Sequence, residues 1–445
     1  MGTRGLLEPI LAWGHAGVNF LLTCRATTAY SAGVTNQASQ TEYRCPGQTY
    51  AISRSVHLGR LACFYPACRQ CAHAADAAEL SPRQGRRWAE VRSRSGSGPQ
   101  FDQEGVAGVW HNELRPDVVG QIARALAAEL RRAGHEGRGV AVVVGCDGGP
   151  LVAEATAAAI DAIRWTGCQA IDAGAVSAAC LALAIDHWQA AGGLLVGNPL
   201  GRANTAGLKF WMGARPLSAG HGLERIQLAA RQPIDRPART YGAMERVEAD
   251  EPYLTGLAEH FHGLRPLRIV LHTTCQPVER YFHELASSVA CQVIPAVCAR
   301  LGEAVSSRAA HFGIAIEDDG EVCHLVDEQG RAVPPDRLLL LVAGHRLARE
   351  PGARVVLEPD APPSLAGRIS RLGGQAVAGG PTRAAMEEAM RSRGAVLGGG
   401  WSGRLWHCCG PAVPDALRTL TCLLVLLSRS DRALSEVLDS EAPAG

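Results

Sequence analysis

The alternation of short apolar runs with helix-like segments, beginning near residue 116, constrains the fold more than any other feature of the chain. Behind Pro116, apolar residues recur at helical spacing, and Val140–Val144 then forms a β-branched run that ends in a glycine-rich turn. Such a run is typical of a strand buried in a parallel sheet. The pattern continues with a predicted helix over 151–163, a strand near Ala170, a helix over 178–189 and a strand over 194–196. The chain is therefore expected to be an α/β protein.

Length and composition agree with several domains. A chain of 445 residues suggests about three, and an apolar content of 47% with 50 glycines suits strands, helices and tight turns. The formal net charge of +1 gives no electrostatic reason to expect a nucleic-acid or membrane-surface partner. The 15 cysteines are spread along the chain, and no apolar run reaches the ~18 residues that span a bilayer. We therefore expect reduced thiols and a cytoplasmic location.

A glycine-framed segment carries the clearest functional signal. The pair Gly192-Gly193 precedes three apolar residues, and Gly207-Leu208-Lys209-Phe210 follows further on. This frame and its spacing resemble the phosphoserine loop of the α-D-phosphohexomutase family, which includes phosphoglucomutase and phosphomannomutase. In that family the strand leads into Thr-Ala-Ser-His-Asn-Pro, and Pro199 stands at the serine position. A pyrrolidine ring offers no nucleophile, so the resemblance implies that ordinary mutase turnover fails and assigns no catalytic residue.

Lys209 keeps the place of the family lysine and has two interpretations. The resemblance places it near the active cleft, where its ammonium group could attract an anion. Alternatively, its aliphatic stem packs beside Phe210 and Trp211 while the charged end reaches towards solvent.

Two further loops resemble the family but lack its arginines. The segment 101–108 matches Phe-Gly-Thr-x-Gly-x-Arg-Gly with Ala107 at the arginine position, and Gly145–Pro150 matches Gly-Arg-Asp-Thr-Arg-Pro without either arginine. The resemblance implies successive α/β/α domains, three in number with the fourth, phosphate-docking domain missing. The expected segments are a disordered extension over 1–40, a zinc-ribbon-like segment over 41–95, and mutase-like domains over 99–235, 250–334 and 335–440.

An acidic turn matches the magnesium loop of the family. The resemblance implies that Glu317, Asp319 and Glu321 stand where the family has the three aspartates of Asp-Gly-Asp-x-Asp-Arg. Carboxylate oxygens suit Mg²⁺, although the longer glutamate side chains would weaken such a site. The alternative is a β-hairpin with its tip at Asp319-Gly320 and solvated acidic flanks.

A glycine-rich segment near the C-terminus resembles the sugar-specificity loop, Gly-Glu-x-Ser-Gly-His. Gly400 replaces the glutamate, Ser402 and Gly403 remain, and Arg404 replaces the histidine. The resemblance implies that Ser402 contacts a sugar hydroxyl, and Arg404 could pair with a phosphate. A flexible turn without a ligand is the other interpretation.

The cysteine-rich segment suggests a separate module. A tetrahedral zinc site needs four ligands, and this segment offers Cys45, Cys63, Cys68 and Cys71. His57 or His73 could replace one of them. Only Cys68 and Cys71 have the usual knuckle spacing. Free thiols in a disordered arm remain the alternative.

Three functions follow from these observations. The first is a catalytically impaired phosphohexomutase homologue of carbohydrate metabolism that binds a hexose phosphate. The second is an active phosphotransferase that uses Thr205 or Asn204 of the same loop. The third is an interaction protein whose zinc-stabilised N-terminal module recruits a protein partner.

Overall fold

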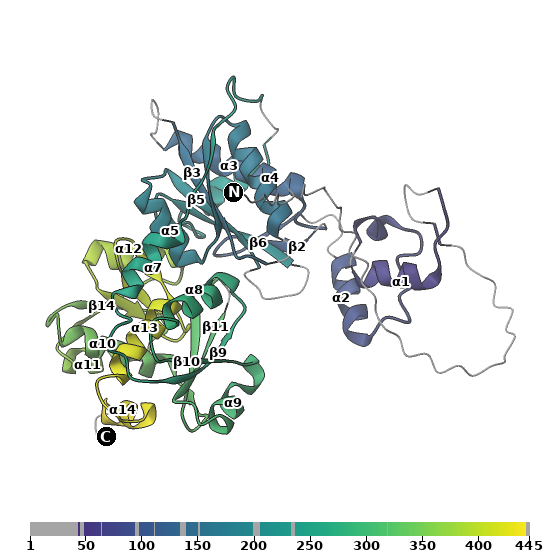
Figure 1. Ribbon diagram of the computed structural model, residues 1–445. Helices are drawn as coiled ribbons and strands as arrows, with labels where there is room; N and C mark the ends of the chain where they lie inside the picture. Colours follow the sequence, from purple (N-terminus) through teal and green to yellow (C-terminus); the bar gives the residue numbers. More distant parts are fainter. Residues whose placement is uncertain are drawn as a thin grey trace, which may run out of the picture. The chain divides into compact units, whose positions relative to one another are not determined.

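Strands of the chain form three separate sheets that follow one another along the sequence (Figure 1). The computed structural model describes residues 43–44, 49–63, 65–93, 98–110, 112–133, 139–149, 152–198, 205–232, 236–317 and 319–441. From Tyr43 onward these residues belong to one unit of mutual contacts. The predicted α/β class is confirmed. The predicted disordered extension lies outside the described residues.

The first sheet has a mixed strand order, β1-β2-β6-β5-β3-β4-β8, with β7 paired to β6. Its strands are β1 (Gln100–Phe101), β2 (Val106–Val109), β3 (Ala141–Cys146), β4 (Gln169–Ala175), β5 (Gly192–Gly197), β6 (Thr205–Met212), β7 (Arg215–Pro216) and β8 (Met244–Arg246). β3 runs parallel to β4 and β5, whereas β6 runs antiparallel to β5 and carries the Gly207-Leu208-Lys209-Phe210 frame. Because β8 pairs with β4, this sheet extends beyond the predicted limit at residue 235.

Both faces of the first sheet are covered by helices. The helices are α3 (Pro116–Arg132), α4 (Val152–Trp165), α5 (Ala178–His187) and α6 (Leu223–Ala230). Val142 and Val144 belong to the core formed with α3, α4 and α6, whereas Val143 points into the core that contains α5. This two-sided burial is why the strand is apolar at successive positions rather than at alternate ones.

The second sheet has the order β10-β9-β11-β12-β13. Its strands are β9 (Arg268–Thr273), β10 (Gln292–Pro295), β11 (Phe312–Glu317), β12 (Val322–Asp327) and β13 (Ala332–Val333), and its helices are α7 (Asp250–Ala258), α8 (Gln276–Ala286) and α9 (Leu301–Ser307) with a 3₁₀ turn at Cys298–Arg300. β11 and β12 pair antiparallel with Glu317 opposite Val322, so the predicted hairpin is confirmed.

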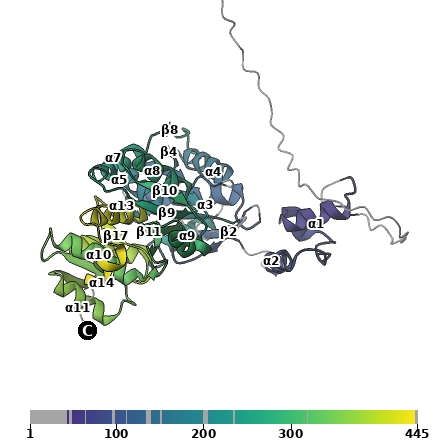
Figure 2. The ribbon, with the colours of Figure 1, turned by 60° about the horizontal axis from the view of Figure 1, so that its bottom comes forward.

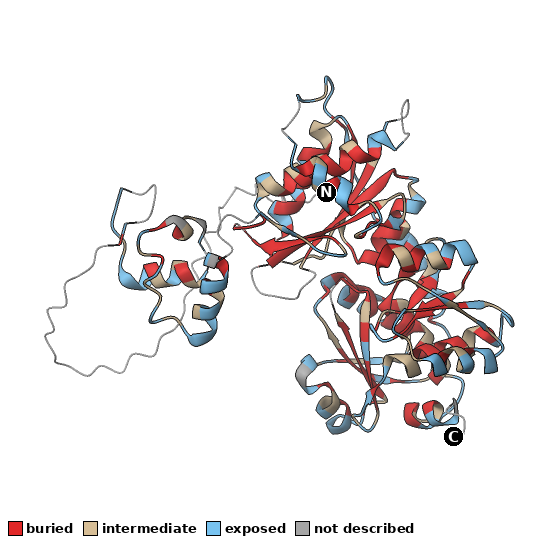
Figure 3. Cartoon of the chain, turned by 180° about the vertical axis from the view of Figure 1, so that it is seen from behind, coloured by how far each residue is buried: buried red, intermediate tan, exposed pale blue. Residues whose placement is uncertain are grey.

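The third sheet has the order β15-β14-β16-β17-β18. Its strands are β14 (Arg354–Leu357), β15 (Gln375–Ala378), β16 (Leu397–Gly399), β17 (Trp406–Cys408) and β18 (Ala412–Pro414). The associated helices are α10 (Pro335–Leu347), α11 (Pro363–Arg371), α12 (Arg383–Arg393), α13 (Ala416–Leu427) and α14 (Leu434–Glu441). Figure 2 shows α10, α13 and β17 next to one another. One apolar core runs from α5 through the second and third sheets, and the buried residues in Figure 3 follow it.

The described part of the cysteine-rich segment is helical and does not support the zinc-ribbon prediction. It contains α1 (Arg54–Ala62), a 3₁₀ turn at Pro66–Gln70 and α2 (Pro82–Ser93), with one isolated bridge between Tyr43 and Ile52 in place of paired β-knuckles. Cys68 and Cys71 are buried in a small apolar core with Leu61 and Trp88. Packing of apolar side chains therefore stabilises the part of this segment that the structure describes.

Candidate functional site

The tip of the β11–β12 hairpin is buried, whereas one of the two interpretations of the sequence placed its acidic flanks in solvent. Asp319 is 4% exposed and Glu321 is fully buried. The carbonyl of Asp319 accepts a hydrogen bond from the Ala178 amide at 3.0 Å, and the carbonyl of Gly320 accepts one from the Ala416 amide at 3.0 Å. The tip is thus held between the N-terminal ends of α5 and α13.

Lys209 joins the first sheet to this tip. Its Nζ lies 2.8 Å from Asp319 Oδ2 and 3.1 Å from Glu321 Oε2, and the residue is 6% exposed. Burial alone would lower the pKa of Lys209, but the charges of Asp319 and Glu321 outweigh it, and the pKa is raised. The ammonium group of Lys209 therefore faces internal carboxylates and does not reach towards solvent; attraction of an external anion by Lys209 stays a prediction.

Two arginines complete the contacts of Glu321. Arg383, the first residue of α12, places Nη2 2.6 Å from Glu321 Oε1 and lies over the ring of Trp211 at 5.0 Å. Arg404 places Nε 3.5 Å from Glu321 Oε2. Burial would raise the pKa of Glu321, but Arg383, Lys209 and Arg404 together lower it to about 2.

Arg404 also binds a carboxylate from the first sheet. Its Nη1 and Nη2 lie 3.0 and 2.8 Å from the two carboxylate oxygens of Glu104, in the turn between β1 and β2. A guanidinium group can bind a phosphate with the same two-point geometry. We call the set of Glu104, Lys209, Asp319, Glu321, Arg383 and Arg404 the charged cluster; it links all three sheets.

Asp147 organises the base of the β5–β6 loop. Its carboxylate accepts hydrogen bonds from the Gly149 amide at 2.9 Å and the Asn198 amide at 2.7 Å. Burial raises the pKa of Asp147 despite these donors. The Thr205 hydroxyl donates to Asn198 Oδ1 at 2.6 Å. Pro199 itself lies outside the described residues, as does Asn204.

The Gly398–Arg404 loop is held by a carboxylate that the sequence did not single out. Glu358, just beyond β14, accepts hydrogen bonds from the amide of Ser402 at 3.0 Å and from its hydroxyl. A Cβ atom at Gly400 would lie 2.6 Å from Glu358 Oε2, so the glycine at this position makes room for that side chain. The exposed Ser402 therefore presents a hydroxyl paired with a carboxylate, beside Arg404.

The three residues predicted to bind Mg²⁺ do not converge on one point. Glu317 lies 3.9 Å from His324 and 3.8 Å from the Cys298 sulfur, whereas Asp319 and Glu321 face Lys209. In the described part of the chain, no group of three or more His, Cys, Asp or Glu side chains could hold a metal ion. The Mg²⁺ set stays a prediction that this geometry does not fit, because internal cations already neutralise two of the three carboxylates.

The predicted zinc ligands also fail to form a site among the residues described. Cys63 is exposed, Cys68 and Cys71 are buried, and Cys45 lies outside the described residues. The two alternative histidines pack on Tyr43, His57 at 4.3 Å between ring centroids and His73 at 5.1 Å.

Several members of the charged cluster carry no sequence signal as ligands of the hairpin tip. Arg383 lies far from Glu321 in the chain, and Glu104 is one acidic residue in a turn. The match of Gly145–Pro150 to a family loop could have drawn attention to Asp147. For Glu358 we see no such signal.

Comparison with known proteins agrees with this fold. The family model for phosphoglucomutase/phosphomannomutase, alpha/beta/alpha domain I, matches residues 98–217, the greater part of the first sheet. The solved structure of a phosphoglucomutase/phosphomannomutase family protein from Burkholderia thailandensis superposes with a TM-score of 0.70 at 21% identity, covering 78% of this chain and 80% of that one. The open form of parafusin, a Paramecium phosphoglucomutase, gives 0.62 at 13% identity, with 78% and 75% covered. At these identities the likeness concerns the fold.

Curated relatives extend the match along the chain. It is 26% identical over 371 residues to a phosphohexose mutase of Xanthomonas campestris, covering 77% of this chain and 80% of the relative. It is 28% identical over 382 residues to the phosphoglucosamine mutase of Moorella thermoacetica, with 76% and 81% covered. The chain is thus similar over about three quarters of its length to proteins of the α-D-phosphohexomutase family, and residues 98–217 match the family model for their first domain. None of its helices in the described residues is long and apolar enough to cross a lipid bilayer.

Proposed function

We propose that the protein is a catalytically impaired phosphohexomutase homologue that binds a hexose phosphate without isomerising it. The observation that carries the proposal is the charged cluster. Lys209 and Arg383 neutralise the buried carboxylates of the acidic turn, while the position matching the mutase serine is Pro199. The cation-binding turn and the phosphoryl carrier of an active mutase are thus both altered in the same chain.

Binding of the sugar is assigned to the Gly398–Arg404 loop. Ser402 and Glu358 together offer a donor and acceptors for sugar hydroxyls at an exposed position. The family loop has a glutamate where this chain has Gly400, and the Glu358 carboxylate supplies an acidic group in its place.

Binding of the phosphate is assigned to Arg404. Its guanidinium group is 20% exposed and holds Glu104, itself 23% exposed, in a two-point contact. A phosphate can take the place of the Glu104 carboxylate because both present paired oxygens to the fork. The names of the relatives, phosphohexose mutase and phosphoglucosamine mutase, support a hexose phosphate as the ligand class.

Phosphoryl transfer through another residue of the loop is not favoured by the contacts. Thr205 is 7% exposed, and its hydroxyl donates to Asn198. Phosphorylation of Thr205 would require this buried hydroxyl to give up its hydrogen bond to Asn198 and become accessible.

The proposal predicts binding without turnover. We expect glucose 1-phosphate, mannose 1-phosphate or glucosamine 1-phosphate to raise the melting temperature, since a ligand at 100 times its Kd stabilises the native state by about 2.7 kcal/mol. The R404Q variant should lose this rise, whereas R371Q, an exposed arginine on α11, should retain it.

Assays of conversion to the 6-phosphate complete the test. We expect none, with or without a hexose bisphosphate, and no phosphoryl adduct in the intact mass. Turnover would contradict the impaired part of the proposal, and an unchanged melting temperature with all three sugars would contradict the binding part.

A further inference from the structure

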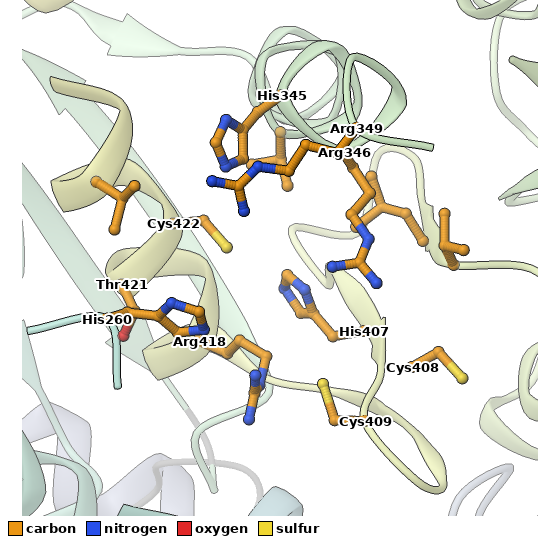
Figure 4. A pocket seen from close by; sticks show the side chains of 14 residues that line it. His260, His345, Arg346, Arg349, His407, Cys408, Cys409, Arg418, Thr421 and Cys422 are labelled. Atoms are coloured by element: carbon orange, nitrogen blue, oxygen red, sulfur yellow. The ribbon is translucent and has the colours of Figure 1, made fainter. Parts of the chain in front are cut away.

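A cavity lies between α10, α13 and β17, apart from the charged cluster. Its volume is about 100 Å³, and none of the residues of the charged cluster lines it. Figure 4 shows side chains from α10, from β17 and from α13 around one opening, with His260 joining them from the segment after α7. We call this cavity the basic pocket.

Arginines supply the charge of the basic pocket. Arg346, Arg349 and Arg418 line it, and no carboxylate does. Glu350 pairs with Arg346 at 3.0 Å from an exposed position, and Asp415 lies 3.9 Å from Arg418. Arg349 has no ion-pair partner among the residues that the structure describes.

The carboxylate nearest to Arg418 has other partners as well. Asp415 accepts a hydrogen bond from the Tyr253 hydroxyl at 3.0 Å and caps α13 by accepting the Arg418 amide at 2.9 Å. Among the described residues, three arginines lie beside only two carboxylates, Glu350 and Asp415, so the basic pocket keeps a net positive charge.

Several buried nitrogen atoms in this wall make no hydrogen bond. In the described structure the Nε atoms of Arg346 and Arg418 and the Nδ1 atom of His345 are buried without a hydrogen bond. An unsatisfied buried polar atom is costly, which makes a ligand or ordered water there favourable.

The histidines of the basic pocket report the same positive potential. Burial, with the charges of Arg429, Arg349 and Arg346, lowers the pKa of His345 to about 4. Burial and Arg418 lower the pKa of His407 to about 3, and its Nε2 lies 2.9 Å from the Thr419 hydroxyl. Both rings are neutral at pH 7, so the cationic groups there are the arginines.

Stabilisation of helix ends explains the position of Arg346 but not that of Arg418. Arg346 lies in the last turn of α10, where a cation stabilises the helix carbonyls. Arg418 lies in the first turn of α13, where the helix dipole disfavours a cation. A role in holding an anion explains both positions.

The remaining wall is apolar. Val342, Leu397, Cys422 and Val425 contribute hydrocarbon and sulfur surface beside the arginines. A free inorganic ion would leave this surface without contacts. We propose that the basic pocket binds a small organic anion, a carboxylate or phosphate monoester with an apolar body, whose charged end is held by Arg346, Arg349 and Arg418.

Isothermal titration calorimetry with phenyl phosphate, and with benzoate as a second anion, tests the assignment on the full chain. We expect both to bind at pH 7 and the neutral benzyl alcohol not to bind. R346Q and R349Q should each weaken binding by roughly tenfold, and V425F, which fills the cavity without changing charge, should abolish it.

A surface control and a second anion separate the basic pocket from the charged cluster. R371Q, an exposed arginine on α11, should leave the affinities for phenyl phosphate and benzoate unchanged. Binding of benzoate that survives both R349Q and V425F, or that is lost in R371Q, would overturn the assignment. If V425F does not fold, the arginine variants decide alone. This inference fails or stands independently of hexose phosphate binding.

Discussion

Glu321 is the residue on which the charged cluster depends, because it contacts three cations while fully buried. Replacing it with glutamine leaves Lys209 and Arg383 in the interior without their counter-charge. We expect E321Q to reduce the free energy of unfolding by about 3–5 kcal/mol, measured by urea denaturation. E317Q alters the same hairpin at an exposed carboxylate and should stay within about 0.5 kcal/mol of wild type. Equal effects of the two variants would refute the role of Glu321.

The lowered pKa of Glu321 predicts that the stability of the protein depends on pH. The pKa of Glu321 falls from 4.5 to about 2 on folding, so its contribution is complete above about pH 4.5 and is lost as the pH drops towards 2. Such a shift corresponds to stabilisation on the order of 3 kcal/mol. Unfolding of wild type and E321Q by urea between pH 2.5 and 7 should therefore give curves that converge at low pH. A constant difference across this range would show that Glu321 keeps its ordinary pKa.

At the scale of the elements, the β11–β12 turn requires a glycine for two separate reasons. Gly320 has φ +92°, and a Cβ atom there would lie 2.9 Å from Val278 Cγ2. Gly373 has a similar φ of +83° but nothing within 4 Å, so it isolates the backbone strain. We expect G373A to cost about 1–2 kcal/mol. G320A should cost about 1 kcal/mol more in the same denaturation experiment, because the tip must move from α8. Identical costs would mean that the tip is not tightly docked.

Elements whose signal is local could be predicted from the sequence. The β-branched run at Val140–Val144 predicted a buried parallel strand, and the Asp319-Gly320 pair predicted the tip of a hairpin; both are confirmed. The zinc-ribbon prediction for the cysteine-rich segment is not supported, because its described residues form helices and Cys68 and Cys71 lie in a small apolar core.

The candidate site was only partly predictable because its contacts join distant segments. Lys209 and the acidic turn were each identified, but their pairing depends on how the first and second sheets meet. Nothing next to Arg383 in the sequence indicates that it binds Glu321. Burial of the acidic turn likewise depends on Ala178 and Ala416, which lie in other parts of the chain.

In the assembled molecule, Lys209 of the first sheet pairs with two of the three carboxylates that the sequence predicted to bind Mg²⁺. We expect the melting temperature of the wild-type protein to be the same in Mg²⁺ and in EDTA, because Lys209 already faces Asp319 and Glu321. In K209M those carboxylates lose the ammonium group, and added Mg²⁺ should raise the melting temperature of the variant alone. A rise with the wild-type protein would instead support the predicted magnesium site.

Binding of a sugar phosphate without its conversion can be tested in one experiment, ³¹P NMR of glucose 1-phosphate mixed with the protein. We expect the 1-phosphate resonance to broaden in the presence of wild-type protein, to sharpen again with R404Q, and to give no 6-phosphate resonance after prolonged incubation. Growth of a 6-phosphate resonance would refute the loss of turnover, and a line as narrow with wild-type protein as without it would refute binding.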